Sequence, residues 1–336
     1  GGELILSANK VNTITLTTVT DGKLTADAAA LTGALTVNGN GIPVGNTASA
    51  SVASVTGDVI VRDAIVSIAG TAGGIIDALG TGGIVNLTGD GNVVGPIGGT
   101  AQVGKISVSG NRTFTHAQFG AAANNGATEL NFADNDKKVT LVDAGASLLA
   151  TNVTLDAGVV GSVIEVKEGP GNVQALTGAI NAAGIKNAAG DFALTINMAA
   201  NANSAVNVTT ANFKTNLTST FDSKITLNLN AGSIGEVGNL GSQNAKFTQT
   251  TFNQAAGAEI SVGDIYSDII NINAGKLAKF RGKVVGTQTN LGDATSKAKF
   301  ADGATLDSAL VGAAGGLVEF EGGAFINKAI RGATSV

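Results

Sequence analysis

The stretch that decides the fold is "GNVVGPIGGTAQVGKISVSGNRTF", residues 91–114. From Gly99 to Ser107 it nearly matches G-x-x-x-x-G-K-[ST], the loop that cradles phosphates in nucleotide hydrolases. A working loop of that kind needs a hydroxyl directly after the lysine and a helix that begins there. Here Ile106 follows Lys105, and "ISVSGNRTF" alternates with the period of a strand. The sequence therefore argues against a nucleotide site and assigns the glycines to turns.

The same pattern, a short alternating strand followed by Gly, Asn or Asp, recurs along the chain. Four successive copies end their strands at Leu87, Val108, Phe132 and Leu155, which follow one another by 21, 24 and 23 residues. Alternation turns one side of each strand inward, and the residues that follow accept the backbone angles of a corner. One such unit cannot bury its own inner face, so neighbouring units must stack.

The period predicts an all-β fold, a parallel β-solenoid with irregular excursions, in which Ile106 and Val108 face the core. Abundant Asn predicts ladders of stacked Asn side chains along the corners of the coils. The alternative is a series of antiparallel β-sandwiches, as in a surface-layer protein, whose strands would recur every 8–12 residues. Three prolines in the chain and short turns favour the solenoid.

Three regions are predicted: a regular solenoid over residues 1–170, an irregular excursion or boundary over 171–222, and a second solenoid over 223–336. Within the middle region, "NVQALTGAINAAGIKNAAG" (172–190) has the apolar spacing of a helix. The segment "TTANFKTNLTSTF" (209–221) places apolar residues four apart, which predicts a short helix or an outward loop.

Composition excludes several classes of protein. The net charge is −5, and no cluster of Lys and Arg forms the basic stripe that nucleic acid needs. Without cysteine there is no disulfide framework, and no apolar run approaches the roughly 20 residues of a transmembrane helix. The first residues, "GGELILSANK", lack the basic and apolar regions of a signal peptide, so a processed chain is expected. A mean hydropathy of +0.27 indicates apolar burial that extends to contacts with other copies.

No catalytic residue and no cofactor site are predicted. The one histidine, His116, is interpreted as a structural or loop residue. A carbohydrate-active solenoid would need two convergent carboxylates and aromatic side chains that stack on sugars, whereas this chain has no Trp and one Tyr. Its nearest carboxylate pairs lie in turns or at strand edges: Asp58 with Asp63, Asp134 with Asp136, and Glu165 with Glu168.

Calcium is the one metal for which the sequence offers candidates. Asp90 in "DGN" and both Asp134 and Asp136 in "DND" supply the hard oxygen atoms that calcium prefers. Neither the EF-hand loop nor the calcium-binding nonapeptide repeat is present, so these residues also fit an ordinary turn-forming role.

Four stretches carry a resemblance to a known family: "VTGDVIV" (55–61), "VNLTGDGNVVGPIGG" (85–99), "VGKISVSGNRTF" (103–114) and "AKFADGATLDSALVGAAGGLVEFEGG" (298–323). Their phrasing resembles the passenger-domain repeats of the rickettsial surface cell antigen autotransporters, which include outer-membrane proteins A and B. The resemblance implies an exported β-solenoid at the bacterial cell surface, separated from its membrane barrel.

Three functions follow as hypotheses. In the first, the protein is a non-enzymatic, self-associating subunit of a surface layer or filament. In the second, it is a monomeric adhesin that presents a solenoid face, or the 171–222 region, to a receptor on host cells. The third is a carbohydrate-active enzyme. Low charge and positive mean hydropathy favour self-association.

Overall fold

The computed structural model consists of parallel strands and, over the part of the chain it describes, contains no helix. It forms two compact units, Gly1–Ile164 and Glu165–Val336. Every strand pairing described is parallel, which confirms the β-solenoid and excludes the antiparallel sandwiches. The described residues are 3–9, 13–17, 22–39, 48–79, 83–115, 126–142, 152–167, 173–176, 192–199, 203–209, 213–230, 235–255, 257–312 and 314–335.

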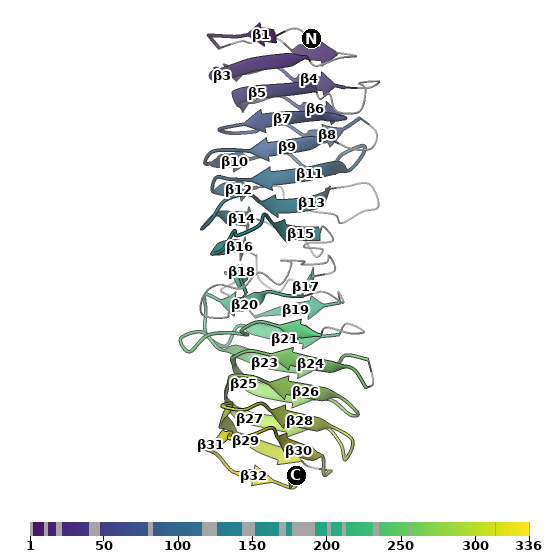
Figure 1. Cartoon of the computed structure of the whole chain (residues 1–336), viewed down its shortest axis with the longest axis vertical. Coiled ribbons are helices and arrows are strands. Elements are labelled where there is room, and N and C mark those ends of the chain that lie inside the picture. The colour runs from purple at the N-terminus through teal and green to yellow at the C-terminus, as the bar shows by residue number, and fades with distance from the viewer. Residues whose placement is uncertain are drawn as a thin grey trace. The chain divides into compact units, whose positions relative to one another are not determined.

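In the first unit, successive coils add strands to three parallel ladders (Figure 1). The eight-stranded ladder runs through β1 (Glu3–Ile5), β3 (Lys23–Leu31), β5 (Ala48–Val55), β7 (Ala64–Ile68), β9 (Ile84–Leu87), β11 (Val103–Val108), β13 (Ala127–Phe132) and β15 (Asn152–Leu155). The four-stranded ladder contains β2 (Ile14–Thr17), β4 (Leu35–Asn38), β6 (Val59–Arg62) and β8 (Ile76–Ala78). The third ladder contains β10 (Gly91–Val93), β12 (Arg112–Phe114) and β14 (Lys138–Val142), and β16 (Ser162–Lys167) spans the boundary between the units.

The second unit repeats this plan. Its nine-stranded sheet contains β17 (Val173–Leu176), β19 (Ser204–Val208), β21 (Ile225–Leu229), β23 (Phe247–Phe252), β25 (Ile265–Ile272), β27 (Lys283–Leu291) and β29 (Thr305–Gly312), with β31 (Phe325–Ile326) and β32 (Ile330–Arg331) both beside β29. Its six-stranded sheet contains β22 (Glu236–Val237), β24 (Glu259–Val262), β26 (Leu277–Phe280), β28 (Lys297–Phe300), β30 (Leu317–Phe320) and β33 (Thr334–Ser335). A further pair joins β18 (Leu194–Met198) to β20 (Asn216–Ser219).

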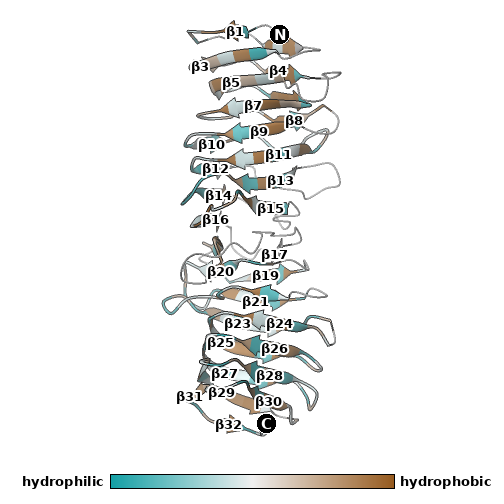
Figure 2. Ribbon diagram, in the orientation of Figure 1, coloured by the Kyte–Doolittle hydropathy of each residue, from teal (hydrophilic) through white to brown (hydrophobic). Residues whose placement is uncertain are grey.

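The core of each unit is a set of apolar columns, one side chain from each coil. In β11, Ile106 pairs with Val85 of the coil before and Leu130 of the coil after, and all three are fully buried. Val108 lies in the neighbouring column and is equally buried, so the predicted inward orientation of both residues is confirmed. Figure 2 shows the alternation of hydrophobic and hydrophilic residues along the strands that produces these columns.

Ladders of Asn side chains join successive coils, as the sequence predicted. At one corner of the second unit, Asn253 Nδ2 donates to Asn230 Oδ1 and Asn273 Nδ2 donates to Asn253 Oδ1, each at 3.1 Å. A second ladder lies on the strands themselves, where Asn228 Nδ2 donates to Asn207 Oδ1 at 2.9 Å. Identical residues in register satisfy one another, which is why Asn recurs at a fixed place in the coil.

The helices predicted between residues 171 and 222 are wrong wherever the structure describes that region. Residues 173–176 form β17 and residues 216–219 form β20. Leu217 of β20 pairs with Ile196 of β18, and both are fully buried. Stacking on the preceding coil outweighs the local helical spacing, because a strand here pairs with the backbone N–H and C=O groups of β18, which a helix would leave without these partners. Residues 177–190, in the other predicted helix, lie outside the described part.

Candidate functional site

The corners of the coils carry the most elaborate polar contacts of the molecule. In the first unit, Asp90 Oδ1 accepts the backbone N–H of Asn111 at 2.7 Å, and Asn111 Oδ1 accepts that of Lys138 at 2.9 Å. In the second unit, the N–H of Asn239 donates to Asn216 Oδ1 at 3.0 Å, and the N–H of Asp264 donates to Asn239 Oδ1 at 2.8 Å. In these coils, one Asn or Asp side chain therefore holds the backbone of the next coil.

Glycine precedes many of these corner residues because atoms of the preceding coil, from a side chain or from the backbone, fill the space beside it. A Cβ atom on Gly263 would lie 2.3 Å from Asn239 Oδ1, closer than real Cβ contacts come. A Cβ atom on Gly110 would lie 2.1 Å from the carbonyl oxygen of Gly89. The recurring Gly-Asn and Gly-Asp pairs are thus explained by contact between coils.

The loop that resembles a phosphate-binding loop does bind an anion, and that anion is the carboxylate of Asp77 in the preceding coil. Asp77 accepts the N–H groups of Gly99, Thr100 and Ala101 at 3.0–3.1 Å and that of Ala78 at 2.9 Å. Consecutive N–H groups of a turn form such a concave anion site. Burial raises the pKa of Asp77, but the hydrogen bonds from Ala101, Thr100 and Ala78 outweigh burial and hold it below its usual value.

The lysine of the same stretch has a separate role. Lys105 lies in β11, and its Nζ forms an ion pair with Glu129 Oε1 of the next coil at 3.2 Å. β11 continues as a strand to Val108, so no helix begins at this lysine. The helix that a nucleotide loop requires is therefore missing from the described residues 103–108.

Arg112 is the most deeply buried charged residue described, with 1% of its surface exposed. Its Nη2 donates to the carbonyl oxygens of Ile68 at 2.8 Å and Ala69 at 3.1 Å, and its Nη1 donates to that of Gly70. Burial lowers the pKa of Arg112 to about 10, an effect that the nearby carboxylate of Asp90 opposes. The guanidinium stays charged at neutral pH and ties β12 to a corner two coils earlier.

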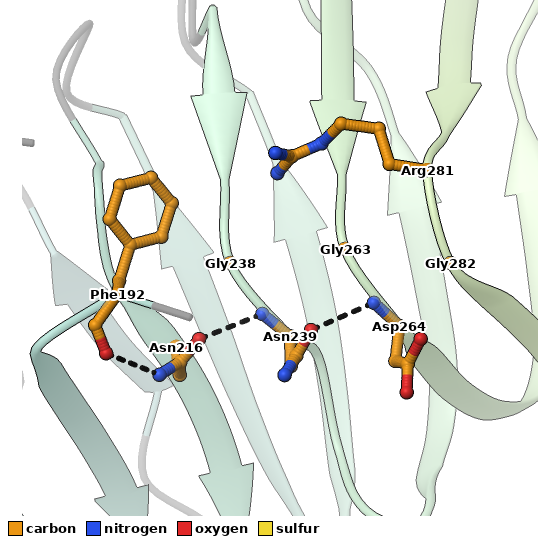
Figure 3. Close-up of a pocket in the computed structure, with 8 residues that line it drawn as sticks. All are labelled: Phe192, Asn216, Gly238, Asn239, Gly263, Asp264, Arg281 and Gly282. Carbon is orange, nitrogen blue, oxygen red and sulfur yellow. Dashed lines mark hydrogen bonds between the residues drawn. The ribbon is translucent and has the colours of Figure 1, made fainter. Parts of the chain in front are cut away.

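A depression of about 190 Å³ opens along the corner that holds Asn216, Asn239 and Asp264. Figure 3 shows these three side chains in a row across successive coils, with the side chain of Arg281 extended over the same corner toward Phe192. The full lining consists of Phe192, Asn216, Gly238, Asn239, Gly263, Asp264, Arg281 and Gly282.

Two charged residues dominate this depression. Arg281 forms an ion pair with Glu236 through Nη1 and donates to the carbonyl oxygen of Val237 at 2.8 Å through Nη2. Asp264 Oδ1 accepts the N–H of Lys283 at 2.7 Å, and Oδ2 lies 3.4 Å from the hydroxyl oxygen of Tyr266. Burial raises the pKa of Tyr266, and the negative charge of Asp264 raises it further. The lining of the depression contains hydrogen-bond donors and acceptors but only one carboxylate, Asp264. Glycoside hydrolysis uses two carboxylates.

The three calcium candidates occupy turns. Asp90 holds the backbone of Asn111, and Asp134 accepts the N–H of Asn135 at 2.9 Å and lies 3.6 Å from Lys137 Nζ. Asp136 adopts a left-handed backbone with φ of 55°. Within the described ranges, no group of three or more acidic or histidine side chains could hold a metal ion. Calcium binding at these residues stays a prediction.

The candidate catalytic carboxylates are likewise engaged in local contacts. Asp58 Oδ1 accepts the N–H of Ile75 at 2.9 Å, Asp63 lies 3.9 Å from Arg62 Nε, and Glu165 lies 3.6 Å from Lys167 Nζ. His116 and Glu168 lie outside the described residues.

Sequence reasoning missed Asp77, Arg112, Asp264 and Arg281. One signal was available for Arg112: in "RTF" it alternates with Phe114, so it shares the inward side of a strand with an aromatic residue. For the others the deciding contacts come from different coils, and no local pattern marks them.

Comparisons of the chain with protein-family models, with curated proteins and with solved structures find no match. The described residues include no helix that could cross a bilayer. The site geometry and the repeat pattern therefore carry the functional argument.

Proposed function

We propose that this protein is a non-enzymatic structural and adhesive solenoid of the bacterial cell surface that associates with further copies of itself. The surface location rests on the resemblance of its repeats to rickettsial surface-antigen passenger domains. The self-association rests on an outward column of small, uncharged polar side chains on the eight-stranded ladder. This polar column contains Thr25, Ser51, Ser67, Asn86, Ser107, Asn131 and Thr154.

The polar column is the observation that carries the proposal. Each of its residues pairs in register with the next. Six of the seven coils present a partly exposed hydroxyl or amide at the same place, whereas Asn131 is 2% exposed and is bonded to Asp156 and Thr154. Successive strands lie roughly 4.8 Å apart, which makes the column a regular row of donors and acceptors. A second copy that lies alongside can match such a row in register, as paired sheets do in other stacked β-structures.

Self-association is tested by sedimentation velocity and negative-stain microscopy over a range of protein concentrations. The wild-type protein is expected to form dimers and larger fibres or sheets. The double variant Ser67→Lys with Ser107→Lys is expected to stay monomeric, because each lysine interrupts the polar column with charge. The control, Thr36→Lys with Thr113→Lys, adds the same charge to outward positions of the other two ladders and should assemble normally.

A wild-type protein that stays monomeric at every concentration contradicts self-association and favours the monomeric adhesin. Loss of assembly in both double variants would show that the polar column has no specific role in assembly. The surface location is tested separately, by labelling intact source cells with antibodies against the chain. The non-enzymatic assignment predicts no release of reducing sugar from a panel of polysaccharides.

A further inference from the structure

The second unit has an outward surface without charged residues, which we call the amide face. It lies on the nine-stranded sheet, where β19, β21, β23, β25, β27 and β29 pair in register. Its first column contains Ala205, Thr226, Gln249, Ile269, Gln288 and Ala309. Its second column contains Asn207, Asn228, Thr251, Asn271, Asn290 and Val311. Ile269 is 39% exposed, Thr251 is 9% exposed, and the remaining residues are partly exposed.

Hydrogen bonds within the amide face hold its side chains in place. Asn290 Nδ2 donates to Asn271 Oδ1 at 2.8 Å, and Gln249 Nε2 donates to Thr251 Oγ1 at 2.9 Å. An amide group has two N–H donors and an oxygen that accepts two bonds, so one such bond leaves capacity for a partner. Side chains that are already ordered lose little conformational freedom on binding, and the amide face is therefore preorganised.

The six-stranded sheet of the same unit has the opposite character. Lys299 on β28 lies 3.3 Å from Glu259 on β24 and 3.9 Å from Glu319 on β30, measured from Nζ to the nearest carboxylate oxygen. Interspersed charges of both signs keep a surface soluble, and their absence favours association. Within this unit, the amide face is thus the surface suited to a partner.

The chemistry of the amide face selects that partner. A charged molecule finds no opposite charge there, and an apolar one would cover amide groups without pairing them. A second array of amides at the same spacing of roughly 4.8 Å supplies a donor for each acceptor and an acceptor for each donor. Another copy of the chain carries such an array, and two-fold symmetry makes the two faces self-complementary.

The size of the amide face decides which role the contact has. Six strands roughly 4.8 Å apart, each with four residues of roughly 3.4 Å, cover about 400 Å² on each copy. This is about half of the roughly 800 Å² that each partner buries in a stable complex. The contact is therefore weak by itself and gains strength between copies that are already held together.

We infer that the amide face is a second contact surface between copies of this chain and joins dimers into fibres or sheets. The inference rests on the proposed function for the dimers, which the polar column of the first unit forms. A column that pairs with the same column of a second copy is used up in the pair, and a two-fold contact of this kind closes. Growth beyond the dimer requires another surface, and the amide face supplies it.

Cysteine cross-linking tests the contact by itself. The chain has no cysteine, so Ile269→Cys introduces a single thiol on the amide face, and Ser261→Cys, on β24 of the charged sheet, is the matched control. Both are made in the Ser67→Lys with Ser107→Lys protein, in which the polar column is blocked. Relative to labelling by a monofunctional maleimide, a short bismaleimide is expected to cross-link Ile269→Cys at least tenfold faster than Ser261→Cys.

Charge on the amide face is expected to abolish this difference. Gln249→Lys with Gln288→Lys places a lysine beside Ile269 in both neighbouring coils, so cross-linking should fall to the rate of the control. Circular dichroism checks that the variant folds. If it does not, Thr226→Lys with Ala309→Lys takes its place, one coil further out on each side.

Sedimentation velocity then tests the role in assembly, with the polar column intact. Gln249→Lys with Gln288→Lys is expected to stop at dimers, whereas the wild-type protein continues to fibres or sheets. The control, Ser261→Lys with Thr334→Lys, adds the same charge to the six-stranded sheet and should assemble as the wild type does.

Two results overturn the inference: cross-linking of Ile269→Cys no faster than that of Ser261→Cys, or wild-type assembly by Gln249→Lys with Gln288→Lys. Protection of the introduced thiol by insoluble cellulose or chitin, without cross-linking, would assign the face to a polysaccharide and overturn it as well. A wild-type protein that stays monomeric contradicts the proposed function. The cross-linking experiment still decides the inference in that case, because it is made with the polar column blocked.

Discussion

At the scale of single residues, the strongest polar contacts join one charged side chain to the backbone of another coil. Asp77 collects four N–H groups, three of them from the loop at 99–101, and Arg112 donates to three carbonyl groups two coils earlier. Hydrogen bonds to charged groups stabilise a fold more than those between neutral groups, by roughly 1.5–3 kcal/mol each. Both residues should therefore contribute measurably to stability.

Asp77→Asn is expected to lower the free energy of unfolding by about 1–2 kcal/mol at pH 7, because the amide keeps one acceptor and loses the charge. The folded pKa of Asp77 is lowered, so its contribution is complete above the ordinary value of about 3.9 and disappears as pH falls through the folded pKa. Urea unfolding at pH 7 and below pH 3 measures this, and the difference between variant and wild type should shrink in acid. An equal difference at both pH values contradicts the role of the charge.

Arg112→Met is expected to destabilise the first unit by about 2–4 kcal/mol, because the carbonyl groups of Ile68, Ala69 and Gly70 lose their donor. Arg62→Met is the control: Arg62 contacts Asp63 at 3.9 Å near the surface, and its loss should cost less than about 0.5 kcal/mol. Chemical denaturation compares the two. Similar losses in both variants would contradict the clamping role of Arg112.

At the scale of the structural element, the spacing between coils limits which residues fit. A Cβ atom on Gly110 would clash with the backbone of the preceding coil, 2.1 Å from the carbonyl oxygen of Gly89. A Cβ atom on Gly99 would meet its nearest neighbours at 3.6 Å, an ordinary distance. The stacking of inward side chains from successive coils also limits which residues fit. Phe300 lies between Phe280 and Phe320, with ring centroids 5.3 and 5.5 Å away.

Gly110→Ala is expected to cost about 3 kcal/mol, because the new methyl group forces two coils apart. Gly99→Ala, in the same stretch of sequence, is expected to be neutral within about 0.5 kcal/mol. Thermal unfolding followed by circular dichroism distinguishes them. If Gly99→Ala proves as costly as Gly110→Ala, contact between coils is not the reason for the glycines.

Phe300→Ala is expected to destabilise the second unit by about 3–5 kcal/mol, since it removes a fully buried ring and opens a cavity beside Phe280. Phe325→Ala removes the same side chain from a site that is 65% exposed and should change stability by less than about 1 kcal/mol. Urea midpoints of both variants provide the comparison. Equal midpoints would argue against the aromatic stack as a source of stability.

At the scale of the whole molecule, the chain forms two compact units of stacked coils. In such repeat structures each coil contacts its neighbours, so stability is close to a sum of local terms. Opening at one place therefore need not unfold the rest.

Hydrogen exchange measured by mass spectrometry is expected to report this independence. Gly110→Ala should speed exchange in β9 to β14 and leave β24 to β30 protected, while Phe300→Ala should do the reverse. The wild-type protein gives the baseline for both. Uniform loss of protection along the whole chain in either variant would show that the molecule unfolds as one cooperative body.

Much of the fold could be predicted from the sequence because the information was local and repeated. Ile106 and Val108 were assigned to the core from alternation alone, and the structure buries both. The helix or outward loop predicted over 209–221 was wrong at residues 216–219. The spacing of Phe213, Leu217 and Phe221 fits a helix, but pairing with β18 makes residues 216–219 a strand. Local spacing does not reveal the unpaired strand edge of a neighbouring coil.

The sequence by itself determined that the chain coils, where its corners lie and which side chains face inward, because these follow from a pattern that each coil repeats. Only the tertiary structure decided which polar atoms meet. Asp58 holds a residue 17 positions ahead, Asn111 one 27 ahead, and Arg112 reaches back 44. Coils differ in length, so partners are fixed by stacking in space and not by a constant interval. For that reason "GGTAQVGK" could be recognised as a turn from its sequence, but that it encloses Asp77 could be learned only from the fold.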